Sequence, residues 1–291
     1  MRIGMTLPSM VAGYDRRTTL DWCRRVDDGP FSSISCGERI TYHNQEILVL
    51  LSAAAALTER VRIVPSVFVL PMHQTAWIAK QIATLDVLSG GRVTVGVGIG
   101  GREQDYQSVG ASASRRHQRL DKQVAELKRL WAGESPFDGA PAVGPAPVQK
   151  GGPPLLAGAL GPKAIGRAAV WAEGIAGFSL DADIAKMSES FRMAEAAWKE
   201  AEREAPPRCV MSFWFALGPD GEARLHDYAR SYLAIYGERA ANAMAGATRM
   251  HSAGALRGAI SALESIGCDE LILVPTTVDV TELDRLLDVI A

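Results

Sequence analysis

Residues Arg62 to Gly101 read RIVPSVFVLPMHQTAWIAKQIATLDVLSGGRVTVGVGIGG, and their pattern is the strongest indication of the fold. Its first part is rich in apolar, β-branched residues, which is typical of a strand buried on both faces. Apolar residues then follow at helical spacing from Trp77 to Leu88. Ser89-Gly90-Gly91 supplies a helix stop, and a second buried strand covers Val93–Val97. Two strands joined through a helix are parallel, so this βαβ unit predicts an α/β fold.

Strands and helices alternate along the rest of the chain. The predicted strands, besides the two in the βαβ unit, are Arg2–Leu7, Phe31–Cys36, Leu155–Ala157, Gly174–Phe178, Cys209–Leu217 and Glu270–Val274. The predicted helices are Thr18–Val26, capped by Thr18 or Thr19, then Asn44–Glu59, Arg115–Trp131, Pro162–Trp171, Asp181–Glu204, Leu225–Tyr236, Ser252–Ile266 and Val280–Ile290. Polar residues 102–114 and the Pro- and Gly-rich residues 133–154 indicate loops or a small insertion. Eight strands, each followed by helical sequence, predict a single (β/α)8 TIM barrel with loop insertions, covering residues 1–291.

Composition sets limits on function. The chain has 291 residues and a formal net charge of −2, so it carries no basic footprint for nucleic acid. No signal peptide and no apolar run long enough for a membrane is expected. The four cysteines are far apart in the sequence, and the five histidines show no metal-ligand spacing. These features predict a reduced, metal-free cytoplasmic protein.

The glycines after the fourth strand allow two interpretations. Gly96, Gly98 and Gly101 satisfy the G-x-G-x-x-G pattern of a Rossmann dinucleotide site. In that site the following helix begins within the glycines, whereas a polar loop is predicted here. At the C-terminal end of a barrel strand, the same glycines would let a flat ring approach the backbone closely. An NAD(P)-dependent Rossmann dehydrogenase therefore remains the less favoured alternative.

Three segments resemble the luciferase-like monooxygenase family. They are the βαβ unit with AKQ-ATLD-LSGGRV-GVG, the helix RRHQRLDKQVAELKRLW at Arg115–Trp131, and LLAGALGPKAIGRAA at Leu155–Ala169. The resemblance covers the chain from Arg2 to about Phe178 and continues more weakly to the end. It implies a TIM-barrel oxidoreductase, here a homodimer, that acts on a small organic substrate with non-covalent coenzyme F420 or, alternatively, FMN. A relative that binds such a cofactor without turnover is the other functional alternative.

The resemblance also implies which residues hold the cofactor. A turn before Pro162, formed by Gly158, Ala159, Leu160 and Gly161, would bind the phosphate. The ring would lie against Ser66 and Val67, a bond that is often a non-proline cis peptide in the deazaflavin members, and against Gly98, Gly100 and Gly101.

Some positions depart from the family pattern. Gly37-Glu38 stands where the deazaflavin-dependent sugar-phosphate dehydrogenases carry Asp-His, and Gly101 stands where they carry Glu, so that chemistry is not expected. Glu38 is the predicted catalytic acid or base, the alternative being a solvated carboxylate or a partner of Arg39. His73 is expected to start a helix or pack. Arg39 and Tyr42 are predicted to line the substrate mouth.

Overall fold

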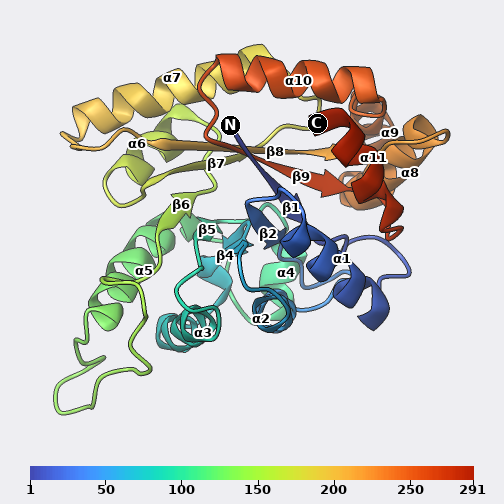
Figure 1. Ribbon diagram of the computed structural model, residues 1–291. Helices are drawn as coiled ribbons and strands as arrows, with labels where there is room; N and C mark the ends of the chain where they lie inside the picture. The colour runs from blue at the N-terminus through green and yellow to red at the C-terminus, as the bar shows by residue number, and fades with distance from the viewer.

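The computed structural model describes residues 1–291, and its nine parallel strands form one sheet in the order β3-β2-β1-β9-β8-β7-β6-β5-β4 (Figure 1). The two strands at the ends of this row, β3 (Arg62–Pro65) and β4 (Phe68–Val69), are two halves of one stretch of chain. A parallel bridge between Ile63 and Val93 joins β3 to the residues that lead into β5. The sheet is therefore a nearly closed barrel, which confirms the predicted α/β TIM-barrel fold and excludes a Rossmann fold.

The elements follow the predicted alternation. The other strands are β1 Arg2–Thr6, β2 Ser33–Cys36, β5 Val95–Gly98, β6 Leu155–Ala157, β7 Gly174–Phe178, β8 Arg208–Phe215 and β9 Glu270–Pro275. The helices that follow barrel strands are α1 Arg16–Asp28, α2 Ile47–Leu57, α3 Thr75–Leu88, α5 Arg116–Trp131, α6 Pro162–Ala169, α7 Ile184–Glu200, α8 Gly221–Leu233, α10 Ala253–Ser265 and α11 Thr281–Ile290. Two further short helices, α4 Glu103–Ser108 and α9 Glu238–Ala245, and two 3₁₀ turns, Leu70–Met72 and Ala234–Tyr236, lie on the loops.

Apolar side chains form two layers around the sheet. Along β9, Leu271 and Leu273 belong to the main core of 58 buried residues, in which side chains of the helices pack on the sheet. Ile272, between them, belongs to a separate cluster contributed by five different strands: Val64, Leu156, Ala176, Val210 and Ile272. Successive side chains of a strand point to opposite faces, so this second cluster fills the barrel interior.

A buried carboxylate closes the N-terminal end of the barrel. Glu270, 1 % exposed, accepts hydrogen bonds from the hydroxyls of Ser32 at 2.6 Å and Ser33 at 2.7 Å. It also pairs with Arg62, and Arg208 Nη2 lies 3.5 Å from Oε2. Burial alone would raise the pKa of Glu270, but the Arg62 charge and the two hydroxyls bring it below its ordinary value. Charged residues at this end hold strands together and leave the opposite end free for chemistry.

Four local expectations are corrected. Helix α1 begins at Arg16, and Asp15 is its N-cap. The backbone N–H and the hydroxyl of Thr18 both donate to the Asp15 carboxylate, so neither Thr18 nor Thr19 is the cap. The segment 102–114 contains α4 instead of being only a loop, and α9 was not expected at all. The third barrel strand is broken at Ser66-Val67. Between α5 and β6, residues 133–154 hold no helix or strand, as predicted.

None of the helices combines the length and the apolar character that a membrane-spanning segment requires.

Candidate active site

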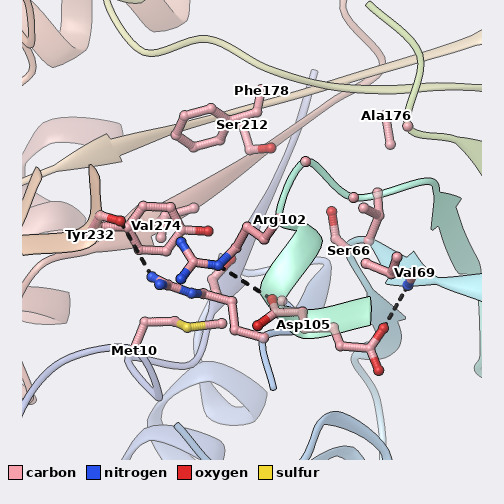
Figure 2. A pocket seen from close by; sticks show the side chains of 18 of the residues that line it. Met10, Ser66, Val69, Arg102, Asp105, Ala176, Phe178, Ser212, Tyr232 and Val274 are labelled. Carbon is pink, nitrogen blue, oxygen red and sulfur yellow. Dashed lines mark hydrogen bonds and ion pairs between the residues drawn. The ribbon is translucent and has the colours of Figure 1, made fainter. Parts of the chain in front are cut away.

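A cavity of about 360 Å³ opens where the strands end, at the C-terminal mouth of the barrel (Figure 2). Ser66 and Val69 line it from the broken third strand, and Phe178, Ser212 and Val274 line it from β7, β8 and β9. The volume lies within the range of about 300–1,000 Å³ that is usual for small-molecule sites. Active sites of TIM barrels occupy this end, so the cavity is the candidate active site.

A bulge at Ser66-Val67 shapes one wall of the cavity. The peptide bond between these two residues is cis, as the resemblance implied, and Ser66 N donates to Cys36 O at 2.8 Å. Glycines of the neighbouring strands make room for the bulge. A Cβ atom would lie 2.9 Å from a methyl carbon of Val67 at Gly98 and at Gly158, and 2.9 Å from Val69 Cγ1 at Gly100. Gly98 and Gly100 are thus explained by packing against Val67 and Val69, and a pyrophosphate is not needed to explain these two glycines.

Glu38 is buried and holds the bulge in place. Its side chain is 3 % exposed, and Oε2 accepts a hydrogen bond from Val69 N at 2.6 Å. Oε1 lies 2.8 Å from His73 Nε2, and the His73 ring stacks on Phe68 with 4.4 Å between centroids. Glu38 is therefore neither solvated nor paired with Arg39, and His73 packs as expected but also pairs with Glu38, which was not foreseen.

Aromatic side chains form the opposite wall. The Trp214 ring contacts Phe178, Tyr228 and Tyr232 edge to face, with centroid distances of 5.0, 5.5 and 5.1 Å. Tyr228 and Tyr232 are four residues apart in α8, which places both on one face of that helix. Burial raises the pKa of both phenols, so they stay protonated at neutral pH.

Two arginines enter the cavity beside this wall. The Arg39 guanidinium lies over the rings of Tyr42 and Tyr232, at 3.6 and 4.6 Å from their centroids. Arg102 Nε lies 3.3 Å from Asp105 Oδ2, and Figure 2 shows these two side chains pointing toward one another near Tyr232. Burial works to raise the pKa of Asp105, but hydrogen bonds from Thr41 and the Arg102 charge bring it below its ordinary value. Asp105 is thus ionised at neutral pH.

The turn after β6 presents unpaired backbone donors. Gly158 N and Ala159 N donate to Val97 O and Ala157 O. The next N–H groups, of Leu160 and Gly161, have no backbone acceptor, and Lys163 N in the first turn of α6 has none either. Pro162 between them has no N–H. Free N–H groups at the start of a helix favour an anion.

The sequence model of the luciferase-like monooxygenases matches residues 1–282. The chain belongs to the luciferase-like monooxygenase family. Among curated relatives, the uncharacterized protein Rv0953c of Mycobacterium tuberculosis is 34% identical over 169 residues, which are 56% of this chain and 59% of that protein. The pyrimidine monooxygenase RutA of Escherichia coli is 34% identical over 103 residues, which are 33% of this chain and 28% of RutA. The matched part thus spans less than two thirds of either relative's length.

Solved structures of low sequence identity share the whole fold. The monooxygenase RslO1 from Streptomyces bottropensis is 20% identical with a TM-score of 0.80, and the match covers 99% of this chain and 97% of RslO1. An F420-dependent secondary alcohol dehydrogenase, solved with an F420-acetone adduct, is 18% identical with a TM-score of 0.79, over 100% of this chain and 99% of the other. Both share the barrel fold along the entire chain.

Most of the predicted site residues do meet in one cavity. Those that line it are Glu38, Arg39, Ser66, Val67, Gly100, Gly101, Gly158 and Leu160. Four lie elsewhere. Gly98 packs against Val67, and Ala159 is 5 % exposed and lines a small second cavity between α5 and α6. Gly161 lies in open space at the start of α6, and Tyr42 stacks on Arg39 without lining the cavity.

Sequence reasoning missed several residues of this luciferase-like site. Arg102 directly follows the glycines at a strand's C-terminal end, and that position alone was a signal. Tyr228 and Tyr232 carried a second signal, their spacing of four on a helix. The pairing of His73 with Glu38 had no sequence signal, since 35 residues separate the two.

Proposed function

We propose that this luciferase-like protein is an oxidoreductase that binds coenzyme F420, or alternatively FMN, without a covalent bond and acts on a small organic substrate. One observation carries the proposal: the bulge at Ser66-Val67 and the donor-rich turn after β6 open onto a single cavity. The bound cofactor would supply hydride transfer, or oxygenation if it is FMN. F420 is put first because the sequence around Ser66-Val67 resembles the deazaflavin members.

The cavity suits a flat, largely apolar ring. Val67 offers an apolar surface, and Gly100, Gly101 and Gly158 send no side chain into the space beside it. More than half of the lining residues are hydrophobic, so water would be displaced from around a bound ring. The protein's part is then to hold the ring and exclude water.

The turn after β6 suits the cofactor's phosphate. The free N–H groups of Leu160, Gly161 and Lys163 lie at the positive end of α6. Leu160 and Gly158 also line the cavity, so a phosphate at the turn and a ring in the cavity can belong to one ligand. The N–H groups would anchor the phosphate and leave the ring free to meet the substrate.

Glu38 is proposed as the group that exchanges a proton with substrate or reduced cofactor. It lines the cavity, and its Oε1 lies 2.8 Å from His73 Nε2, within reach for proton transfer between the two side chains. Because both carboxylate oxygens already accept hydrogen bonds, the same geometry also fits a relative that binds the cofactor without turnover. Measured turnover separates these two functions.

We also propose a cytoplasmic location, supported by four cysteines that are all buried and unpaired.

Titration of the purified protein with F420, FMN and NADP⁺, followed by absorbance and fluorescence, tests the cofactor. We expect F420 to bind best, FMN to bind more weakly or comparably, and NADP⁺ not to bind. If neither F420 nor FMN binds, the proposed function is wrong.

A further inference from the structure

The guanidinium of Arg39 is buried and almost without hydrogen bonds. Arg39 is 6 % exposed, and its one hydrogen bond, from Nη1 to Tyr232 O, is 3.4 Å long. Its Nε is buried and has no acceptor. Most of its five N–H donors are therefore unused, although the rings of Tyr42 and Tyr232 cover the guanidinium.

Arg102 is also largely buried and has a guanidinium N–H without an acceptor. Its side chain is 13 % exposed, and its Nε has no hydrogen-bond acceptor, although Asp105 Oδ2 lies 3.3 Å away. Asp105 Oδ1 already accepts two hydrogen bonds from Thr41, at 2.8 Å from N and 2.5 Å from Oγ1. Asp105 is thus largely occupied by Thr41.

Charge in this part of the cavity does not balance. Arg39 and Arg102 bring two positive charges, and Asp105 brings one negative charge. The other carboxylate of the cavity, Glu38, is already bound to Val69 N and His73. Burial together with the Arg102 charge lowers the pKa of Arg39, so the excess positive charge makes the charged form of Arg39 less favourable. An unpaired buried charge is costly, and a ligand anion would remove the cost.

We propose that the substrate of this cavity is a carboxylic acid with an apolar body, and that Arg39 and Arg102 bind its carboxylate. The planar guanidinium matches a carboxylate with two parallel hydrogen bonds. The apolar body then lies against Trp214 and Phe178, next to the arginines. That the bound acid is a substrate rests on the proposed function. That the two arginines bind a carboxylate rests only on the contacts described above.

This anion site differs from the one for the cofactor's phosphate. Arg39 follows β2, whereas the donor-rich turn follows β6, and by the shorter way around the nearly closed barrel the β3–β4 stretch and β5 lie between these two strands. One cavity thus has room for a cofactor phosphate at one side and a substrate carboxylate at the other.

The test compares two probes of the same shape and different charge, 2-naphthoate and 2-naphthamide, by calorimetry on the protein of residues 1–291. We expect naphthoate to bind at least about tenfold more tightly than the amide. In Arg39→Met, which keeps an unbranched apolar stem between the tyrosines, this preference should vanish, and in Arg39→Lys it should be partly kept. Arg102→Met is the second variant if Arg39→Met does not fold, and Arg17→Met, an arginine with an 88 % exposed side chain, is the control.

Three results would overturn the inference: equal affinity for the two probes, no binding of either in the millimolar range, or an unchanged preference in the folded cavity variants. Titration of the same proteins with F420 and FMN separates it from the proposed function. Cofactor binding without naphthoate preference contradicts only the carboxylate site. Naphthoate preference without cofactor binding supports the site and contradicts only the proposed function. If Arg39→Met weakens cofactor binding and spares naphthoate, the arginine belongs to the cofactor and the inference is wrong.

Discussion

A Cβ atom on Gly98 would lie 2.9 Å from Cγ2 of Val67. Real Cβ atoms do not come so close to a neighbour, so β5 lies beside the bulge only because residue 98 has no side chain. Val67 lines the cavity and Gly98 does not, so Gly98 lies behind Val67 in the cavity wall. Gly98 would thus influence a bound ring through Val67.

Replacing Gly98 by Ala should therefore destabilise the protein by about 1–3 kcal/mol, the usual cost of overpacking. Val67→Ala removes the opposing methyl groups and should recover part of this loss in the double variant, with a coupling of about 0.5–3 kcal/mol. Denaturant unfolding of the four proteins measures both effects. Additive losses would show that the two residues do not press on one another.

Gly161→Asp should lower cofactor affinity at least about tenfold, because its carboxylate would repel the phosphate at the free N–H groups. A Cβ at residue 161 meets no atom within 4 Å, so the fold should be spared. Gly161→Asn, with the same shape and no charge, is the matched control and should bind nearly as well as the natural protein. Equal affinities of the Asp and Asn variants, measured by fluorescence titration, would mean that the turn does not hold the phosphate.

Glu38→Gln should reduce turnover by about 10²-fold or more while cofactor affinity changes little. The Gln amide oxygen can still accept from Val69 N, and its NH₂ can donate to His73 Nε2 when the imidazole carries its proton on Nδ1, so the bulge should keep its shape. Separate measurement of kcat, KM and cofactor Kd is required. A change in kcat within two- or threefold would leave Glu38 with a purely structural role.

At the other end of the barrel, Glu270→Gln should cost about 3 kcal/mol at neutral pH, because Arg62 and Arg208 lose their counter-charge. The folded-state pKa of Glu270 is below its ordinary value of 4.5. Its stabilisation is thus present above about pH 4.5 and is lost as pH falls through the folded-state pKa. The variant should therefore show a shallower loss of stability on acidification. Parallel acid-unfolding curves for both proteins would contradict this account.

We propose that the homodimer implied by the sequence forms through α2 and α3, which lie next to each other in Figure 1. Four large apolar side chains are exposed there: Val49 at 72 %, Trp77 at 64 %, Leu88 at 54 % and Val87 at 45 %. Large exposed apolar side chains on two neighbouring helices favour an interaction surface. Light scattering should give a dimer for the natural protein and a monomer for Trp77→Lys, and a natural monomer would contradict the proposal.

The sequence predicted the barrel and the turn after β6 because both depend on local patterns. Apolar runs and helical spacing in Arg62–Gly101 follow directly from burial, and the Gly158–Gly161 turn is marked by its glycines and the following proline. Helix α4 has no such pattern. Its place depends on tertiary contacts, such as Tyr106 Oη donating to Ile99 O at 2.5 Å and Asp105 accepting from Thr41.

The polar contacts of the cavity were beyond sequence reasoning for a different reason. Glu38 and His73 lie on different loops, and they meet only once β2, β3 and the bulge have taken their register. The same holds for Arg39, whose stacking partner Tyr232 is 193 residues away. Gly98 was predicted to leave space for the ring of a cofactor, but the missing side chain leaves space for the neighbouring Val67.

A crystal structure of the protein with F420 or FMN bound, whichever binds more tightly, would locate the cofactor. We expect the ring in the cavity beside Val67 and Gly158, with phosphate oxygens about 3 Å from the N–H groups of Leu160 and Gly161. A ring bound outside this cavity, or a phosphate that makes no contact with the turn after β6, would contradict it.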